Sequence, residues 1–158
     1  MLHIADESTR VERCGHRFVQ RLHVFGIEIG DSRREHGRSQ LGLDIYASPA
    51  EALAAGKQAD IVLSSHMIEH VPALSTYLDA IAAALRPSTM IHIAPHVDEI
   101  EADPALATII GAEHPLGITQ GFWTRYASTR NYRIVVEIDG YAPGSSCGEI
   151  IACLTSAS

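Results

Sequence analysis

The sequence predicts an α/β fold: a mostly parallel sheet with helices on both faces and an antiparallel hairpin at its carboxyl-terminal edge. Three observations support this prediction. Short apolar runs rich in β-branched residues alternate with segments of helical spacing, which is typical of parallel sheets. Residues 61–65 (IVLSS) begin as an apolar run between polar residues, as expected for a strand buried on both faces. The last two expected strands, residues 132–138 and 149–154, are joined by a loop too short for a helix.

The other elements are expected from hydrophobic spacing and from residues that start or stop helices. We expect further strands over residues 1–5, 23–28, 41–46 and 90–94, and helices over residues 8–22, 31–40 and 98–112.

Three more helices are expected from sharper local signals. Ser48-Pro49-Ala50-Glu51 has the form of a capping box with proline in the first turn, and Gly56 ends that helix. An apolar stripe predicts a helix that Pro87 terminates; its members are Leu74, Leu78, Ile81 and Leu85. Thr119 is expected to cap a helix that extends through Tyr126.

Length and composition indicate one globular domain over residues 1–158. The formal net charge is −7, so the sequence gives no strong signal for nucleic acid as a partner. Three cysteines without a CxxC pair suggest a reducing compartment. We find no signal sequence and no run of membrane-spanning length, and therefore expect a soluble cytoplasmic protein without a membrane partner.

Candidate chemistry is concentrated directly after the strand over residues 61–65. His66, Glu69 and His70 lie there within five residues. In open α/β sheets, functional groups gather beyond the carboxyl ends of the strands. We therefore expect the functional site at this edge of the sheet.

The order of these features resembles the class I S-adenosylmethionine-dependent methyltransferases, in the group whose fourth strand runs into an "EHV" turn. The resemblance rests on the following residues in order: Ala59-Asp60-Ile61-Val62-Leu63-Ser64-Ser65-His66-Met67-Ile68-Glu69-His70-Val71-Pro72, Ala84-Leu85-Arg86-Pro87-Ser88, His114-Pro115-Leu116-Gly117-Ile118-Thr119 and Phe122-Trp123. It implies a Rossmann-like methyltransferase sheet, S-adenosylmethionine as cofactor and a small-molecule methyl acceptor.

The resemblance also implies cofactor-binding residues. Glu28, at the end of the strand over residues 23–28, would hold the ribose hydroxyls, and Asp44 and Ser64 would also line the cofactor site. The glycine-rich turn of the family is missing, because the sequence contains no GxGxG. Residues 5–9 would replace this turn, or residues 14–18 would be a remnant of it.

The turn His66-x-x-Glu69-His70 allows three interpretations. The H-x-x-E-H spelling occurs in inverted zinc peptidases, but those need a long helix around the motif. In related O-methyltransferases an E-x-x-E-H turn holds a divalent metal; here His66 replaces the first glutamate, and His114 or His96 would add a ligand. Alternatively, Glu69 and His70 shape the turn without any metal.

The resemblance favours a methyltransferase that acts on an oxygen or nitrogen of a small molecule, with proton removal by His66 or His70. The alternative is a non-catalytic methyltransferase fold that serves as a binding or oligomerisation module, because the glycine-rich turn is missing. A metal-dependent hydrolase or lyase on the same sheet is a third hypothesis. A homodimer is a further expectation for either of the first two.

Overall fold

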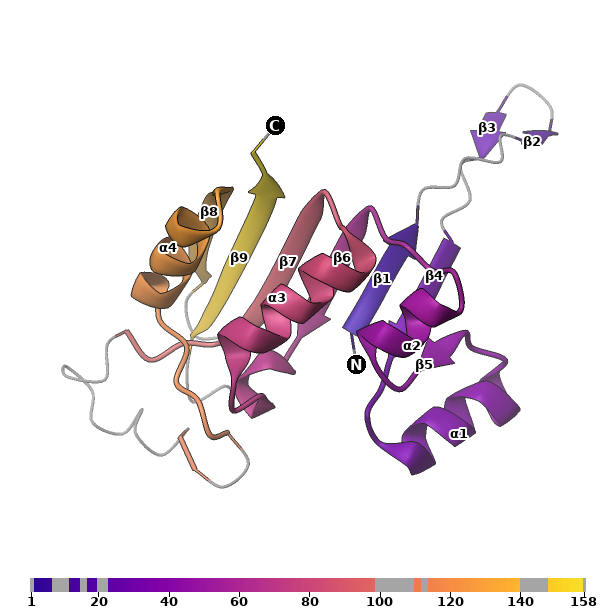
Figure 1. Ribbon diagram of the computed structural model, residues 1–158, viewed down its shortest axis with the longest axis horizontal. Coiled ribbons are helices and arrows are strands. Elements are labelled where there is room, and N and C mark those ends of the chain that lie inside the picture. Colours follow the sequence, from indigo (N-terminus) through magenta and orange to yellow (C-terminus); the bar gives the residue numbers. More distant parts are fainter. Residues whose placement is uncertain are drawn as a thin grey trace.

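The computed structural model describes residues 2–6, 12–14, 17–19, 23–98, 110–111, 114–139 and 148–157. Seven of the described strands form one sheet in the order β5-β4-β1-β6-β7-β9-β8 (Figure 1). They are β1 (Leu2–Asp6), β4 (His23–Ile27), β5 (Ile45–Tyr46), β6 (Ile61–Ser65), β7 (Thr89–Pro95), β8 (Tyr132–Asp139) and β9 (Glu149–Ser156). Strands β2 (Glu12–Cys14) and β3 (Arg17–Val19) pair separately. The α/β class and the antiparallel β8–β9 hairpin are confirmed.

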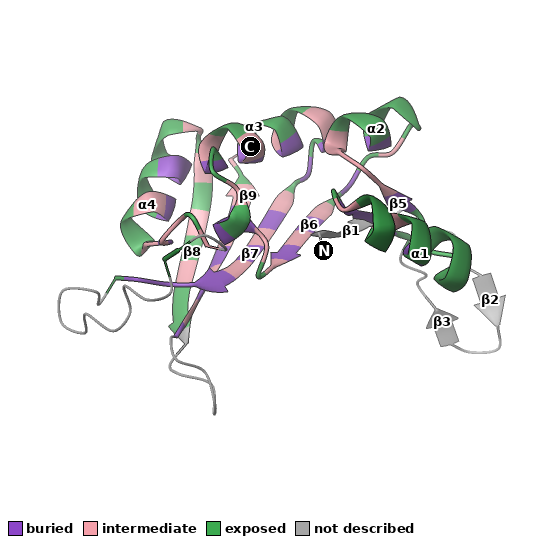
Figure 2. Ribbon diagram, turned by 90° about the horizontal axis from the view of Figure 1, so that it is seen from below, coloured by how far each residue is buried: buried purple, intermediate pink, exposed green. Residues whose placement is uncertain are grey.

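Helices lie on both faces of the sheet, as predicted. Figure 2 shows α2 (Pro49–Ala54), α3 (Leu74–Leu85) and α4 (Gln120–Thr129) along one face. Helix α1 (Asp31–Leu41) packs against β5 on the other face, so closely that a Cβ on Gly37 would lie 2.5 Å from Ile45 Cδ1. A short 3₁₀ helix, η1 (Ile68–His70), follows β6.

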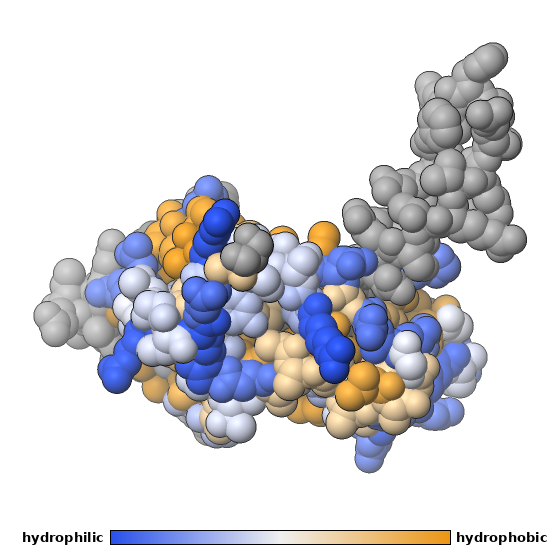
Figure 3. Space-filling view, turned by 45° about the horizontal axis from the view of Figure 1, so that its top comes forward, coloured by the Kyte–Doolittle hydropathy of each residue, from blue (hydrophilic) through white to orange (hydrophobic). Residues whose placement is uncertain are grey.

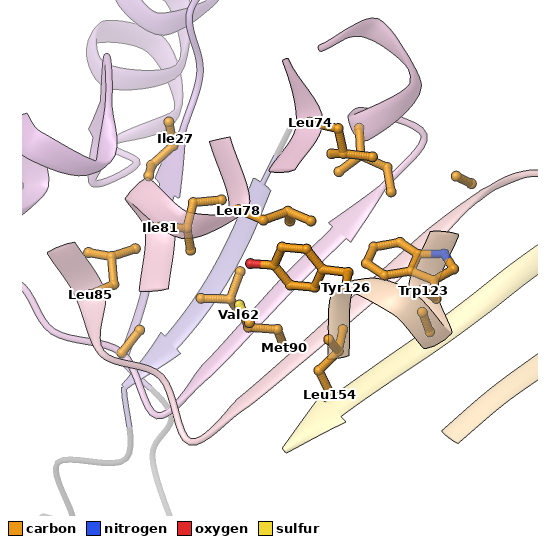
Figure 4. Packing of buried hydrophobic residues seen from close by; sticks show 14 of the residues in the cluster. Ile27, Val62, Leu74, Leu78, Ile81, Leu85, Met90, Trp123, Tyr126 and Leu154 are labelled. Carbon is orange, nitrogen blue, oxygen red and sulfur yellow. The ribbon is translucent and has the colours of Figure 1, made fainter. Parts of the chain in front are cut away.

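The hydrophobic core fills the space between the sheet and the layer of α2, α3 and α4 (Figure 4). All four residues of the predicted stripe on α3 are buried, and Trp123 and Tyr126 of α4 lie beside them. The sheet contributes every second residue of its central strands, such as Val62, Met90 and Leu154. This alternation follows from the two-residue period of a strand. The core therefore fixes which side chains of β6 and β7 point inward.

The direction of β1 differs from the prediction of a parallel first strand. Its register pairs Leu2 with Ile27 and with Ser64, so β1 runs antiparallel to both β4 and β6. Residues 8–22 were expected to form a helix, but strands β2 and β3 lie in this segment. A parallel β1 would need a crossover of a dozen or more residues, usually helical, whereas an antiparallel strand returns through a hairpin.

This reversal moves both predicted substitutes for the glycine-rich turn away from the functional edge. Ala5 pairs with Ile61, the first residue of β6, and Asp6 with His23, the first residue of β4. Residues 5–9 therefore begin at the amino ends of β4 and β6. Cys14 pairs with Arg17 in the small β2–β3 sheet, which connects β1 to the start of β4. Ala5 and Asp6 therefore lie at the opposite end of β4 and β6 from the candidate site.

One other prediction falls largely outside the described residues, namely the helix expected over residues 98–112. Among the helices that the structure describes, none has the length and apolar character needed to cross a membrane.

Candidate functional site at the carboxyl edge of the sheet

The carboxyl ends of β4, β6 and β7 meet at one edge of the sheet, since these three strands run in the same direction. Glu28 follows β4, the turn from His66 to His70 follows β6, and His96 follows β7. The fold therefore gathers these predicted residues at the edge where α/β sheets bind ligands.

Glu28 is held in a fixed position at the end of β4. Its side chain is buried, and its Oε1 atom accepts a hydrogen bond of 2.8 Å from the backbone N–H of Gly30. A Cβ on Gly30 would lie 3.1 Å from the same oxygen, so the close approach favours glycine at this position. Arg34 Nη1 donates to the backbone oxygen of Glu28 at 2.9 Å. These contacts orient a carboxylate at the site edge, and Gly30 and Arg34 were not predicted from the sequence.

The chain leaves β6 through a sharp turn at His66. This residue has φ = 48°, in the left-handed region, which costs a residue with a Cβ about 1 kcal/mol. Its backbone N–H donates to Ile93 O at 2.9 Å, which compensates part of that cost. The side chain is half exposed, and its Nε2 lies 2.8 Å from Glu149 Oε1. His66 is thus oriented by a carboxylate from the start of β9.

Glu69, His70 and His114 form a cluster beside this turn. One candidate ligand atom from each residue lies within 4.8 Å of those of the other two. The imidazole rings of His70 and His114 are 4.7 Å apart, centroid to centroid. The backbone N–H of Leu116 donates to Glu69 O at 3.3 Å, which fastens the segment that carries His114 to η1.

The Glu69 carboxylate is the feature of this cluster that favours binding of a cation. Its side chain is 2% exposed, and neither oxygen accepts a hydrogen bond from the residues that the structure describes. Burying a carboxylate without hydrogen-bond partners is costly, and a bound cation offsets that cost. Ligands of tetrahedral zinc stand about 3.4 Å apart, given bonds of about 2.1 Å. The three groups supply ligand types that such an ion takes, and they lie within 4.8 Å of one another.

The predicted fourth ligand, His66, is not part of this cluster. Its Nδ1 is 3.7 Å from Glu69 Oε1, but the ring is turned toward Glu149. His96 also lies outside the cluster, and its Nδ1 is 3.7 Å from Asp98. Glu149 was missed in the sequence, because the predicted hairpin did not place the last strand beside β7. In the structure β9 begins at the carboxyl end of β7, where Glu149 pairs with Pro95.

Ser64 lies with the core residues rather than at the site edge. Its hydroxyl is fully buried, and Oγ is 2.6 Å from His92 Nδ1. His92 stacks on Trp123, with 5.2 Å between ring centroids and 10° between ring planes. The cofactor-binding role predicted for Ser64 therefore receives no support from its side-chain position.

Asp44 precedes β5, and its carboxylate is paired within the protein. It lies 2.7 Å from Lys57 Nζ, a residue in the loop that leads to the amino end of β6. The pKa of the Asp44 carboxyl is lowered, because hydrogen bonds from Lys57 and Tyr46 outweigh the opposing effect of burial. The cofactor-binding role of Asp44 therefore stays a prediction.

A pocket of about 310 Å³ adjoins the cluster. Its walls are residues 72–76, which lead into α3, together with Leu116, Gly117, Ile118 and Phe122. Leu116 in its wall is the residue whose backbone N–H donates to Glu69 O, so the pocket lies next to the cluster. Most of its lining is apolar, with hydroxyls from Ser75 and Thr76.

Comparison with known proteins gives a consistent result. A family model described as "Methyltransferase domain" matches residues 11–93, more than half of the chain. Ubiquinone biosynthesis O-methyltransferases are similar over part of their length. The protein from Parvibaculum lavamentivorans is 41% identical over 78 residues, 49% of this chain and 30% of that protein. The one from Paramagnetospirillum magneticum is 31% identical over 99 residues, 60% of this chain and 39% of that protein. The matched region thus spans about a third of these relatives.

Solved structures show the same fold at low sequence identity. The methyltransferase domain of bacterial CtHen1-C has a TM-score of 0.60 and 15% identity, and the match covers 85% of this chain and 77% of that domain. Small RNA methyltransferase HEN1 has a TM-score of 0.51 and 18% identity, over 71% of this chain and 16% of that protein. Identities this low establish the fold alone.

Proposed function

Because the chain belongs to the methyltransferase domain family, we propose that it binds S-adenosylmethionine at the carboxyl edge of its sheet and methylates a small molecule. The observation that carries the proposal is the buried Glu28 carboxylate, fixed by the Gly30 N–H at the end of β4. A carboxylate at this position in a Rossmann-like sheet accepts hydrogen bonds from the ribose hydroxyls of a nucleoside.

In the proposed reaction an oxygen or nitrogen of the acceptor attacks the methyl carbon of the cofactor. The new bond to carbon forms as the carbon–sulfur bond breaks, and S-adenosylhomocysteine leaves with the sulfur's electron pair. The acceptor proton passes to an imidazole at the edge. Positioning of the two reactants in line is the main contribution of the protein.

The two candidate bases then take different roles. We assign Glu69, His70 and His114 to a divalent ion, for which two imidazoles and one carboxylate favour zinc, iron or nickel over magnesium. A bound ion would lower the pKa of an acceptor hydroxyl. An imidazole that binds an ion cannot also accept a proton, so His66 is the better base. Glu149 holds its ring in place, as the second member of a carboxylate–imidazole pair.

The pocket beside the cluster suits an apolar part of the acceptor. Its walls, from the start of α3 and residues 116–118, would hold that part while the reacting hydroxyl faces the cluster. Phe122 supplies an aromatic wall. The acceptor class supported best is therefore a small molecule with a hydroxyl next to an apolar group.

Titration calorimetry with S-adenosylhomocysteine tests the cofactor site. We expect micromolar binding to the folded protein. Glu28→Ala should weaken it at least tenfold, which corresponds to about 1.4 kcal/mol, because the ribose loses its acceptor. Glu35→Ala is the matched control, since it removes an exposed carboxylate from α1, and it should bind like the unaltered chain.

The alternative function, a non-catalytic binding module, is favoured by one observation. Because β1 is reversed, Leu2 lies between the carboxyl ends of β4 and β6, and it does not lead into a glycine-rich turn there. The same titration separates the two. If a folded sample gives no binding heat at high ligand concentration, the methyltransferase proposal is refuted and the non-catalytic binding module remains.

A further inference from the structure

Strand β8 is the last strand of the sheet, and its outer edge faces away from β9 (Figure 1). It is eight residues long and pairs along its whole length with β9. Among the described residues no backbone hydrogen bond reaches its outer edge. Long edge strands of this kind pair readily with another strand, because every second N–H and C=O is directed outward.

The side chains of β8 alternate between two unlike sets. On the face toward α4, Ile134 and Val136 pack on the core together with Tyr132. The opposite face carries Arg133, Val135 and Glu137, all of them exposed. Val135 is 62% exposed, a high value for an apolar residue in the middle of a strand. Figure 3 shows hydrophobic surface next to strongly hydrophilic side chains at the end of the molecule that carries α4 and β8.

We propose that β8 is a dimerisation edge that pairs antiparallel with β8 of a second copy of this chain, about a twofold axis at Val135. The argument is the symmetry of the exposed charges. Arg133 and Glu137 stand two residues on either side of Val135, so each arginine lies directly opposite the glutamate of the other copy. Opposite charges in directly facing positions stabilise an antiparallel pair.

The other face of the strand obeys the same symmetry. Ile134 lies opposite Val136 of the second copy, and Tyr132 lies opposite Ile138, which is 45% exposed. From Tyr132 to Ile138, every cross-strand pair in this register is therefore either oppositely charged or apolar. The exposed Val135 side chains meet at the axis, so the pairing covers the largest apolar exposure on the strand.

Neighbouring registers are less favourable. A twofold axis normal to the sheet pairs residues whose side chains lie on the same face. In each alternative register the axis therefore passes through a different residue of β8. Centred on Ile134, it places Arg133 opposite Val135. Centred on Val136, it places Val135 opposite Glu137. Only the axis at Val135 pairs both charges, which makes β8 complementary to itself rather than to an arbitrary strand.

The proposed dimer leaves the candidate site accessible. The twofold axis joins the two sheets edge to edge through β8, whereas the site lies at the carboxyl ends of β4, β6 and β7. The axis reverses the strand direction in the second copy. The two sites therefore lie at opposite ends of the strands in the joined sheet, and they share no residue.

Sedimentation equilibrium of charge-reversed chains tests this register. Arg133→Glu places glutamate opposite glutamate twice per dimer, and Glu137→Arg places arginine opposite arginine twice. Each variant should dimerise at least tenfold more weakly than the unaltered chain. An equimolar mixture of the two should return to within about threefold of the original affinity, because each facing pair is again opposite in charge. The double variant Arg133→Glu/Glu137→Arg should also dimerise normally.

Matched controls carry the same charge changes elsewhere. Arg33→Glu and Glu35→Arg alter exposed residues of α1, far from β8 along the sheet, and should leave the dimer unchanged. Circular dichroism confirms that each variant is folded. A monomer at 200 µM, or a dimer that ignores the β8 reversals, would overturn the proposal. So would single variants whose mixture fails to associate.

Discussion

His92 is a titratable side chain inside the hydrophobic core, between the sheet and α4. It is fully buried, stacked on Trp123, with Nδ1 bonded to Ser64. Its Nε2 has no hydrogen-bond partner among the described residues, so a charged ring would have no acceptor for its second proton there. Burial lowers the pKa of His92 to about 4. The residue is thus neutral in the folded chain throughout the physiological range.

This pKa predicts a loss of stability in mild acid. Between pH 7.5 and pH 5 the unfolded chain binds a proton at His92, with a pKa near 6.5, whereas the folded chain does not. The free energy of unfolding should therefore fall by about 2 kcal/mol over this range from His92 alone. Urea unfolding at the two pH values measures the change, and His92→Gln should make it smaller by that amount.

A control separates this effect from general acid sensitivity. His36→Gln removes an exposed histidine of α1 and should leave the pH dependence of unfolding as it was. An equal fall in stability for His92→Gln and the unaltered chain would contradict the assignment.

At the scale of elements, the helix starts follow from residues close in sequence. Ser48 Oγ accepts from Glu51 N at 3.1 Å, and Thr119 Oγ1 accepts from Phe122 N at 3.1 Å, both as predicted. The Glu51 carboxylate reaches back to the N–H of Ala47 at 2.6 Å, one residue before the position expected for a capping box. Bonds that span three or four residues need no tertiary information, so the sequence predicts them well.

The cap of α2 has a measurable energetic effect. Ser48→Ala leaves the N–H of Glu51 without its side-chain acceptor and should lower the free energy of unfolding by about 1 kcal/mol. Ser48→Asp supplies another acceptor and should retain most of the stability. Urea unfolding compares both with Ser39→Ala, an exposed serine inside α1 that caps nothing. A loss as large in Ser39→Ala as in Ser48→Ala would argue against the cap.

Strand direction was not predictable in the same way. Residues 2–6 have the composition of a strand in either orientation, and the choice depends on pairing with β4 and β6, far along the chain. Residues 8–22 also lacked a decisive period. Val19 and Phe18 suit a strand as well as a helix, and the helix prediction was wrong because pairing of β2 with β3 prevailed.

At the scale of the whole molecule, the sequence predicted the edge that holds the candidate site but not every side-chain direction. Glu69, His70 and His114 were expected together and do cluster. Ser64 shares the parity of Val62 along β6, so the two-residue period already placed it in the core. The orientation of His66 depends on its left-handed backbone and on Glu149, both set by tertiary structure.

The same cluster links distant parts of the chain, so a bound ion should stabilise the whole molecule. Zinc at a hundred times its dissociation constant would add about 2.7 kcal/mol, which raises the melting temperature by roughly 5–10 °C. Differential scanning calorimetry with added zinc should show this shift. It should disappear in His114→Ala and persist in His36→Ala. His66→Ala should retain it too, because His66 lies outside the cluster and pairs with Glu149. Loss of the shift in His66→Ala would instead make His66 a ligand, and its absence in the unaltered chain would rule out this zinc site.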